Sequence, residues 1–116
     1  MNPTGPRFSL TGPDIALPGD ASLALSLIIH ELSTNAAKYG ALRHDQGHVK
    51  VEWNEEGREV ALSWIEIDGP PVDPPGGQGF GSLLIKRAFS QAFDPHTSFA
   101  FQPNGLKFSL RFKLPN

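Results

Sequence analysis

Residues 30–40 read HELSTNAAKYG and follow Ala21–Ile29, a segment that is apolar except for two serines. Apolar residues recur through both segments at helical spacing, and a Pro-Gly-Asp sequence before them and Gly40 after them are typical helix boundaries. We therefore predict one helix that has Asp20 or Ser22 as its N-cap and stops at Gly40, the expected C′ glycine. Because its residues are largely apolar, this helix should cover another layer of the fold.

The remaining chain supplies that layer as strands. Short segments that alternate apolar and polar residues occur in pairs, and turn sequences separate the members of each pair. The predicted strands are 7–10, 14–17, 48–53, 58–67, 97–102 and 106–114; the turn of the middle pair is 54–57, and a second helix is predicted over 82–92. Residues 69–81 contain four prolines and five glycines and are predicted to form an irregular loop. The order ββ-α-ββ-α-ββ predicts a two-layer α/β sandwich, a mixed β-sheet with both helices on one face.

The composition limits the classes of function. At 116 residues the chain is long enough for one domain, and we expect a disordered N-terminal leader over 1–6 and the folded domain over 7–116. The absence of cysteine excludes disulfides and cysteine metal sites, and a net charge of −2 gives no broad attraction to nucleic acid or anionic lipid. The sequence has neither an apolar run long enough to span a bilayer nor a signal-peptide pattern. We therefore expect a cytoplasmic protein with no nucleic-acid partner and no membrane contact.

Three polar residues interrupt the apolar helix. Glu31, Asn35 and Lys38 are spaced by four and three residues, so they share one narrow side of the helix. That side could be a solvated edge or the wall of a cleft. Asn35 favours the cleft, because asparagine is a poor helix former and its amide oxygen is a suitable ligand for Mg²⁺. His30 points away from this side and is expected to be a packed, structural histidine.

Two carboxylates appear where strand 58–67 enters the glycine-proline loop. Glu66 and Asp68 continue the alternation that directs Trp64 toward the core. Either the strand has already ended at this point and the alternation no longer matters, or a carboxylate lies at the floor of a pocket. In a pocket it could accept a hydrogen bond from a ligand amine such as N6 of adenine.

The loop itself contains a third motif. Residues 77–89 read GQGFGSLLIKRAF, in which glycines open the second helix. Backbone N–H groups and the helix dipole at such an end suit phosphate, although glycine-rich turns before helices are also common packing devices. The pattern is neither a P-loop nor a dinucleotide-binding fingerprint. The three motifs in this order predict a nucleotide site.

The motifs resemble those of the ATP-binding domains of histidine kinases, specifically of the HWE subfamily. The subfamily takes its name from a histidine in the first motif and a later Trp-x-Glu, which match His30 and Trp64-Ile65-Glu66 here. GFGSLLIKRAF resembles the family's glycine box and GLKFSLRFKLP its closing strand, so the similarity extends over about residues 8–115. It implies the Bergerat fold of the GHKL superfamily, with ATP and Mg²⁺ as ligands.

The resemblance assigns roles to matching positions. Asn35 would hold Mg²⁺, Glu31 would be the acidic group near the γ-phosphate, and Lys38 would approach the phosphates. Tyr39 would line the nucleotide pocket, and Glu66 would read adenine. The other expected nucleotide contacts are Asp68, Gly69, Gly79, Phe80, Gly81, Ser82 and Leu83.

The sequence departs from the subfamily at one of these positions. HWE sequences usually have Gly-Gly before the prolines, whereas here Asp68 precedes Gly69. Asp68 is two residues beyond Glu66 and would point the same way in a strand. Either carboxylate could therefore meet adenine, and Glu66 is the one we expect.

The resemblance also implies a function. The catalytic domain of a two-component sensor histidine kinase presents MgATP to a histidine on a separate dimerisation domain, from which the phosphoryl group passes to a response regulator. Because these 116 residues contain no such domain, the isolated chain is expected not to phosphorylate itself. The rival classes are an anti-sigma-type GHKL serine kinase, an ATPase of the topoisomerase or chaperone kind, and a non-catalytic nucleotide-binding or docking module. The Trp-x-Glu motif disfavours the serine kinase. An ATPase of the topoisomerase or chaperone kind would need a transducer domain that these residues lack. The presence of all three nucleotide motifs disfavours a non-catalytic module.

Overall fold

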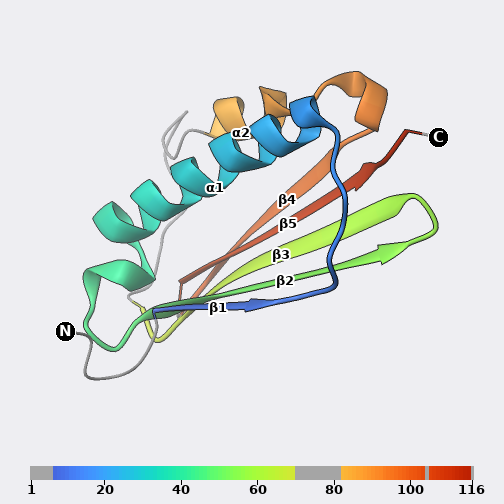
Figure 1. Ribbon diagram of the computed structural model, residues 1–116. Coiled ribbons are helices and arrows are strands. Elements are labelled where there is room, and N and C mark those ends of the chain that lie inside the picture. The colour runs from blue at the N-terminus through green and yellow to red at the C-terminus, as the bar shows by residue number, and fades with distance from the viewer. Residues whose placement is uncertain (1–6, 70–81, 104, 116) are drawn as a thin grey trace.

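A computed structural model of the chain describes residues 7–69, 82–103 and 105–115. The predicted leader and loop residues 70–81 lie outside the described residues. The described residues form one mixed five-stranded sheet, and both helices lie on the same face of it (Figure 1). This arrangement confirms the predicted two-layer α/β sandwich.

One parallel and three antiparallel pairings make the sheet mixed. The elements are β1 (Phe8–Thr11), α1 (Gly19–Tyr39), β2 (His48–Glu56), β3 (Glu59–Ile67), α2 (Ser82–Ala88), β4 (His96–Gln102) and β5 (Gly105–Lys113), with 3₁₀ turns η1 (Ala41–Arg43) and η3 (Gln91–Phe93). Across the sheet the order is β1-β2-β3-β5-β4, and only β1 and β2 are parallel neighbours. Parallel neighbours need a crossover connection, which α1 provides.

The predicted strand 14–17 is wrong, and among residues 7–18 the structure has one strand before α1 instead of two. The segment runs from β1 to α1 without strand pairing (Figure 1). The carbonyl oxygen of Pro13 accepts a hydrogen bond of 2.7 Å from the indole N–H of Trp53, and Ile15 and Leu17 pack against the core. The apolar residues alternate here because two of them, Ile15 and Leu17, pack against the core, although their segment is not a strand.

Other predicted boundaries also need correction. α1 begins at Gly19 with Pro18 at the N-cap position, so the prediction of Asp20 or Ser22 as the N-cap is wrong. β2 and β3 extend to a two-residue loop at Gly57 and Arg58, where Gly57 has a φ of 63°, a conformation that glycine adopts without strain. The second helix ends at Ala88 rather than at residue 92. Beyond it, the hydroxyl of Ser90 accepts a hydrogen bond from the N–H of Ala92 and caps the turn η3.

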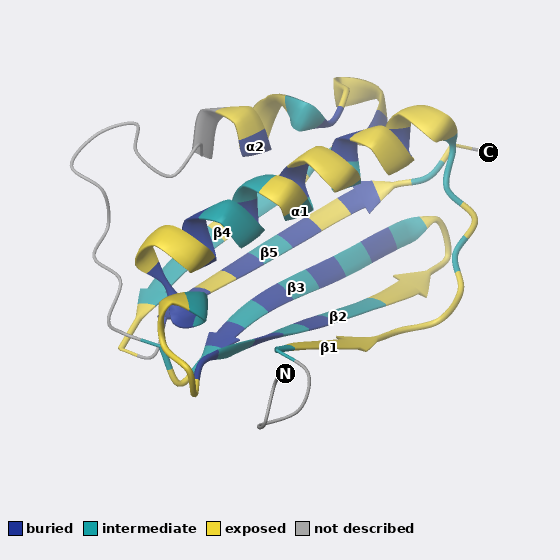
Figure 2. Ribbon diagram, turned by 60° about the vertical axis from the view of Figure 1, so that its left-hand side comes forward, coloured by how far each residue is buried: buried dark blue, intermediate teal, exposed yellow. Residues whose placement is uncertain are grey.

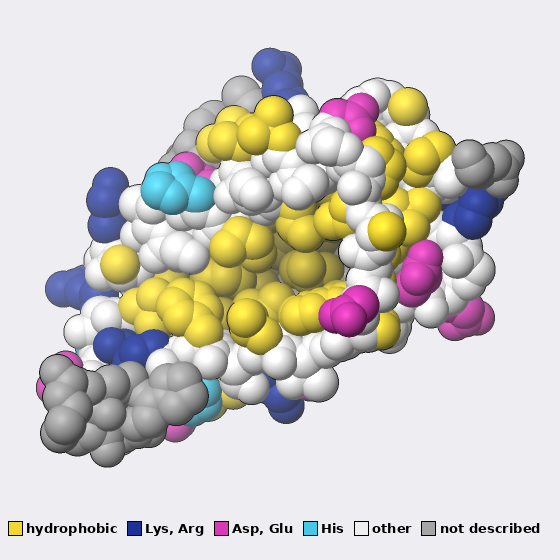
Figure 3. Space-filling model, viewed as in Figure 1, with side chains coloured by type: hydrophobic (Ala, Val, Ile, Leu, Met, Phe, Trp, Pro, Cys, Tyr) yellow, Lys and Arg dark blue, Asp and Glu magenta, His cyan; other side chains and the backbone are white. Residues whose placement is uncertain are grey.

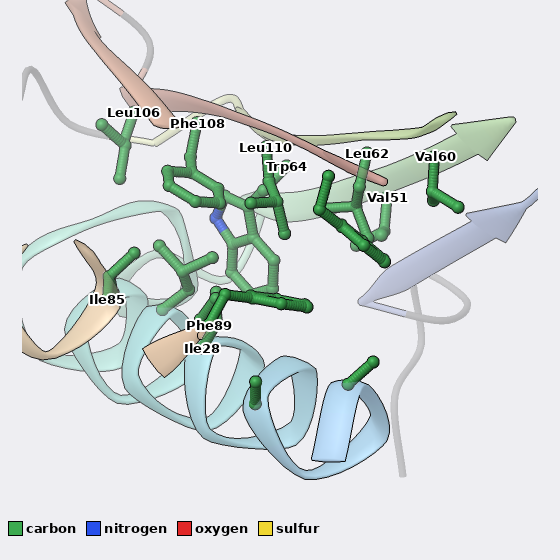
Figure 4. Close-up of a cluster of buried hydrophobic side chains, with 14 of the residues drawn as sticks. Ile28, Val51, Val60, Leu62, Trp64, Ile85, Phe89, Leu106, Phe108 and Leu110 are labelled. Carbon is green, nitrogen blue, oxygen red and sulfur yellow. The ribbon is translucent and has the colours of Figure 1, made fainter. Parts of the chain in front are cut away.

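The core lies between the helices and the sheet. Buried and less buried residues alternate along β3 and β5, as their sequences predict (Figure 2). Trp64 and Phe108 are completely buried and lie side by side in the core (Figure 4). Phe112 contacts both Phe89 and Phe93, with ring centroids 4.5 and 6.4 Å apart, so α2 and η3 are held on the sheet by aromatic contacts.

An apolar hollow of about 470 Å³ opens between the first half of α1, β1 and the connecting segment 12–18 (Figure 3). Leu25 and Ile29 of α1 and Trp53 of β2 belong to its lining. The hollow lies among residues of the first half of α1, whereas the polar residues singled out above lie in the second half. No helix of the described part of the chain has the length and hydrophobicity needed to cross a membrane.

Candidate functional site

The candidate site lies where the end of α1 meets the end of β3. There the backbone N–H of Ala41, the residue after Gly40, donates a hydrogen bond of 2.9 Å to Oε1 of Glu66. The two residues are 25 positions apart in sequence. This bond brings the first and second sequence motifs together in space.

Glu66 is a buried carboxylate with two defined donors. Its residue is 5 % exposed, and its side chain points into the layer between sheet and helices, as the alternation predicts. Besides the N–H of Ala41 on Oε1, the indole Nε1–H of Trp64 donates to Oε2 at 3.1 Å. Each carboxylate oxygen can accept two hydrogen bonds, so each retains capacity for one more donor.

Glycines allow the backbone to pack closely around this carboxylate. A Cβ added to Gly40 or to Gly105 would overlap the side chain of Glu66, and one added to Gly69 would overlap Ala41. α1 ends at Tyr39, directly before Gly40 as predicted, but Gly40 has a φ of −120° and so lacks the left-handed conformation that is common for a glycine at a helix end. Glycine is required here because the carboxylate occupies the space of a side chain.

Asp68 does not share the inward face with Glu66. β3 ends at Ile67, and Asp68 is exposed with a φ of 59°. The position where HWE sequences usually have glycine is thus left-handed, and aspartate is one of the few other residues that tolerate this conformation. The prediction that both carboxylates face inward is wrong for Asp68, and Glu66 is the buried one.

The polar residues on α1 lie at different depths. Asn35 is buried, with 7 % of its surface exposed, and belongs to the helix face that packs on the sheet. Glu31 is half-buried, whereas Lys38 and Tyr39 are exposed. The three residues that helical spacing places on one side of α1 therefore differ in exposure: Asn35 is buried, Glu31 is half-buried and Lys38 is exposed.

A magnesium ion would find few protein ligands here. Among the described residues, no three His, Cys, Asp or Glu side chains gather in a way that could hold a metal. Mg²⁺ often binds one or two protein oxygens together with phosphates and water. The amide oxygen of Asn35 fits such a site, which requires the phosphates to complete it.

His30 is exposed, so the expectation of a packed, structural histidine is wrong. Its backbone carbonyl accepts a hydrogen bond from the hydroxyl of Thr34 at 2.9 Å. Gly79, Phe80 and Gly81 lie outside the described residues. Ser82 and Leu83 form the first two positions of α2, and their side chains also lie outside the description.

The Trp64 indole has a role in the site that the sequence motifs do not indicate. The alternation along β3 predicts that Trp64 faces the core, and it is buried, but a buried indole N–H needs an acceptor. Glu66, two residues further along the same strand face, was the available signal, because residues i and i+2 of a strand point the same way. The contact between Glu66 and Ala41 had no local signal.

The chain is similar to histidine kinases. It is 33% identical over 106 residues to a blue-light-activated histidine kinase of Brucella anthropi, an alignment that covers 88% of this chain and 22% of that protein. It is 43% identical over 82 residues to blue-light-activated histidine kinase 1 of Erythrobacter litoralis, covering 68% and 23% respectively. The chain thus spans about a fifth of the length of these curated relatives. No model of a protein family matches it.

Solved structures show the same fold. The blue-light activated histidine kinase EL346 of Erythrobacter litoralis aligns with a TM-score of 0.76 over 93% of this chain and 35% of that one, at 16% identity. The nucleotide-free catalytic domain of histidine kinase ThkA aligns with a TM-score of 0.69 over 92% and 77%, at 15% identity. The solved structures share the fold of this chain, and the sequence relatives show its family: the chain belongs to the histidine kinase family.

Proposed function

We propose that this chain is the ATP-binding catalytic domain of a two-component sensor histidine kinase of the HWE type. The observation that carries the proposal is Glu66, a buried carboxylate with spare acceptor capacity at the end of β3, beside the turn that ends α1. A buried anionic acceptor of this kind suits an amine of a bound base, and a hydrogen bond to a charged group is stronger than one between neutral groups.

The residues of α1 would serve the phosphates. Asn35 would hold Mg²⁺, whose charge counters that of the phosphates when it is bound. Glu31, half-buried one turn earlier, would lie near the γ-phosphate, and the exposed Lys38 would approach the phosphates as a second positive charge. Tyr39, exposed beside the turn, would line the pocket, and the glycines of the loop would supply backbone donors.

The chemistry would require little covalent work by the domain. It would hold the γ-phosphoryl group in line with a histidine nitrogen on the dimerisation domain of the same protein, so that the bond to the β-phosphate oxygen breaks as the bond to nitrogen forms. A response-regulator aspartate would accept the group next. We place this domain in the cytoplasm, with no nucleic-acid partner and no membrane contact of its own.

Phosphotransfer with γ-labelled ATP tests the proposal. We expect no stoichiometric label on the isolated chain, and an acid-labile label on the dimerisation domain when that domain of the parent protein is added. An acid-stable label on a serine would instead indicate the serine kinase class. No binding of ATP at any Mg²⁺ concentration would leave only a docking module, and the proposal would be wrong.

A further inference from the structure

We infer that Trp64 is a positioning residue: its indole N–H orients the Glu66 carboxylate so that the site discriminates a purine bearing an N6 amine from one without it. The inference rests on the proposed function. It goes further, because it assigns the selectivity to a hydrogen bond within the core of the domain.

The two donors on Glu66 act at different oxygens. The N–H of Ala41 binds Oε1 and the indole N–H of Trp64 binds Oε2, at 2.9 and 3.1 Å. Two donors on the two oxygens of one carboxylate fix both its position and the plane of the group. A glutamate without them would have several rotamers, and ordering it upon ligand binding would cost side-chain entropy.

Both donors are neutral groups, so they hold the carboxylate without cancelling its charge. None of the ion pairs seen among the described residues involves Glu66. The charge therefore remains available to an amine donor of a ligand. The oxygens each keep one acceptor position, and the fixed plane determines where those positions point.

Trp64 is well placed for this role because other side chains pack around its ring. It is 0 % exposed, and Figure 4 shows its ring beside Phe108, with Ile28 on the opposite side of the core. On the other side its ring meets Phe8 edge-on, with centroids 5.9 Å apart. An indole packed among such neighbours has fewer rotamers to choose from than an exposed donor would, so it orients the carboxylate. The alternative is that Glu66 only satisfies the buried indole.

Binding of ATP and of inosine triphosphate separates these alternatives. The two nucleotides differ at one edge of the base: ATP has an N6 amine and an unprotonated N1, whereas inosine triphosphate has a carbonyl oxygen at C6 and an N–H at N1. Calorimetry on the unchanged chain should give a preference for ATP of roughly 10- to 150-fold, the range for a hydrogen bond to a charged acceptor. Trp64→Phe should reduce this preference by about threefold or more, mostly through weaker ATP binding, because one of the two orienting bonds is gone.

Trp53→Phe is the matched control. Trp53 also donates its indole N–H, to the carbonyl of Pro13 at 2.7 Å, but it lines the apolar hollow and not the candidate site. The Trp53→Phe variant should prefer ATP over inosine triphosphate by the same factor as the unchanged chain. A Trp64→Phe variant that binds both nucleotides more weakly by the same factor would overturn the positioning role, because a purely structural contribution does not distinguish the two bases.

A measurement on the unchanged chain covers the case in which Trp64→Phe does not fold. The chain has two tryptophans, so its ¹⁵N spectrum should contain two indole signals. ATP should shift the Trp64 signal more than inosine triphosphate does and leave that of Trp53 in place. Equal shifts with both nucleotides would overturn the inference alone, whereas no binding of either nucleotide would overturn the proposed function.

Discussion

Gly40 and Glu66 lie in contact, with the carboxylate oxygen in the space that a side chain on Gly40 would occupy. The contact joins the residue that ends α1 to the last inward-facing residue of β3. Any group larger than hydrogen at position 40 must displace the carboxylate or the helix end. The geometry of the candidate site therefore depends on one glycine.

Gly40→Ala should destabilise the domain by about 1–3 kcal/mol, the usual cost of overpacking a close contact. It should also weaken ATP binding, because the displaced carboxylate loses its hydrogen bond from Ala41. Chemical denaturation and calorimetry measure the two effects. Gly19→Ala is the control, because nothing lies near a Cβ at this helical position, and it should be neutral or stabilising. Equal behaviour of the two variants would contradict the contact.

Replacing the carboxylate tests its structural part. Glu66→Gln keeps one acceptor oxygen but turns an amide N–H₂ toward one of the two buried donors, which should cost about 1–3 kcal/mol of the free energy of unfolding. Glu66→Ala leaves both donors without an acceptor and should cost more. Urea unfolding monitored by tryptophan fluorescence gives both values.

Glu52→Gln serves as the control for this series. The side chain of Glu52 is 45% exposed and forms a surface ion pair with Lys50 at 3.5 Å. Loss of this ion pair in Glu52→Gln should change the free energy of unfolding by less than about 1 kcal/mol. If Glu66→Gln were as mild as Glu52→Gln, the hydrogen bond from Ala41 to Glu66 would not hold the turn after α1 in place.

Asn35→Ala should abolish most of the strengthening of ATP binding by Mg²⁺. The amide oxygen of Asn35 is the oxygen ligand that we assign to the ion on α1, and alanine supplies none. Titration of ATP with and without Mg²⁺ measures the effect. Thr34→Ala is the neighbouring control, because the hydroxyl of Thr34 donates to its own helix at the carbonyl of His30. A Mg²⁺ effect that survives in Asn35→Ala would disprove the assignment.

His30→Ala should leave the free energy of unfolding within about 0.5 kcal/mol of the unchanged chain, as is usual for an exposed position without special contacts. The side chain of His30 is exposed, and the hydrogen bond at this residue uses only its backbone carbonyl. Urea unfolding of the variant and of the unchanged chain measures this difference. A loss of more than about 2 kcal/mol would mean that the imidazole is packed after all.

Most of the sheet and α1 could be predicted, because local patterns determine them. Leu106, Phe108, Leu110 and Phe112 alternate with polar residues along β5, and all four are buried as predicted. The prediction of a strand over 14–17 is wrong because apolar and polar residues also alternate in a connection that packs on the core. Periodicity reports which residues are buried and does not report whether their backbone finds a pairing partner.

The site was only partly predictable for the same reason. The alternation along β3 correctly placed Glu66 inward, but the end of the strand at Ile67 depends on the left-handed conformation of Asp68. Helical spacing grouped Glu31 with Asn35, whereas their depths depend on how far α1 is rotated toward the sheet. The contact of Glu66 with Ala41 joins distant parts of the chain, and no local pattern encodes it.

The central claim is that MgATP binds at the junction of α1 and β3. Mapping of backbone amide shifts on titration with MgATP tests it most directly, because it reports the location of binding as well as its occurrence. We predict saturable shifts that are largest over residues 35–41 and 65–69, with little change at Leu10 and Trp53 beside the apolar hollow. Shifts confined to the hollow, or no saturable shifts at millimolar MgATP, would contradict the claim.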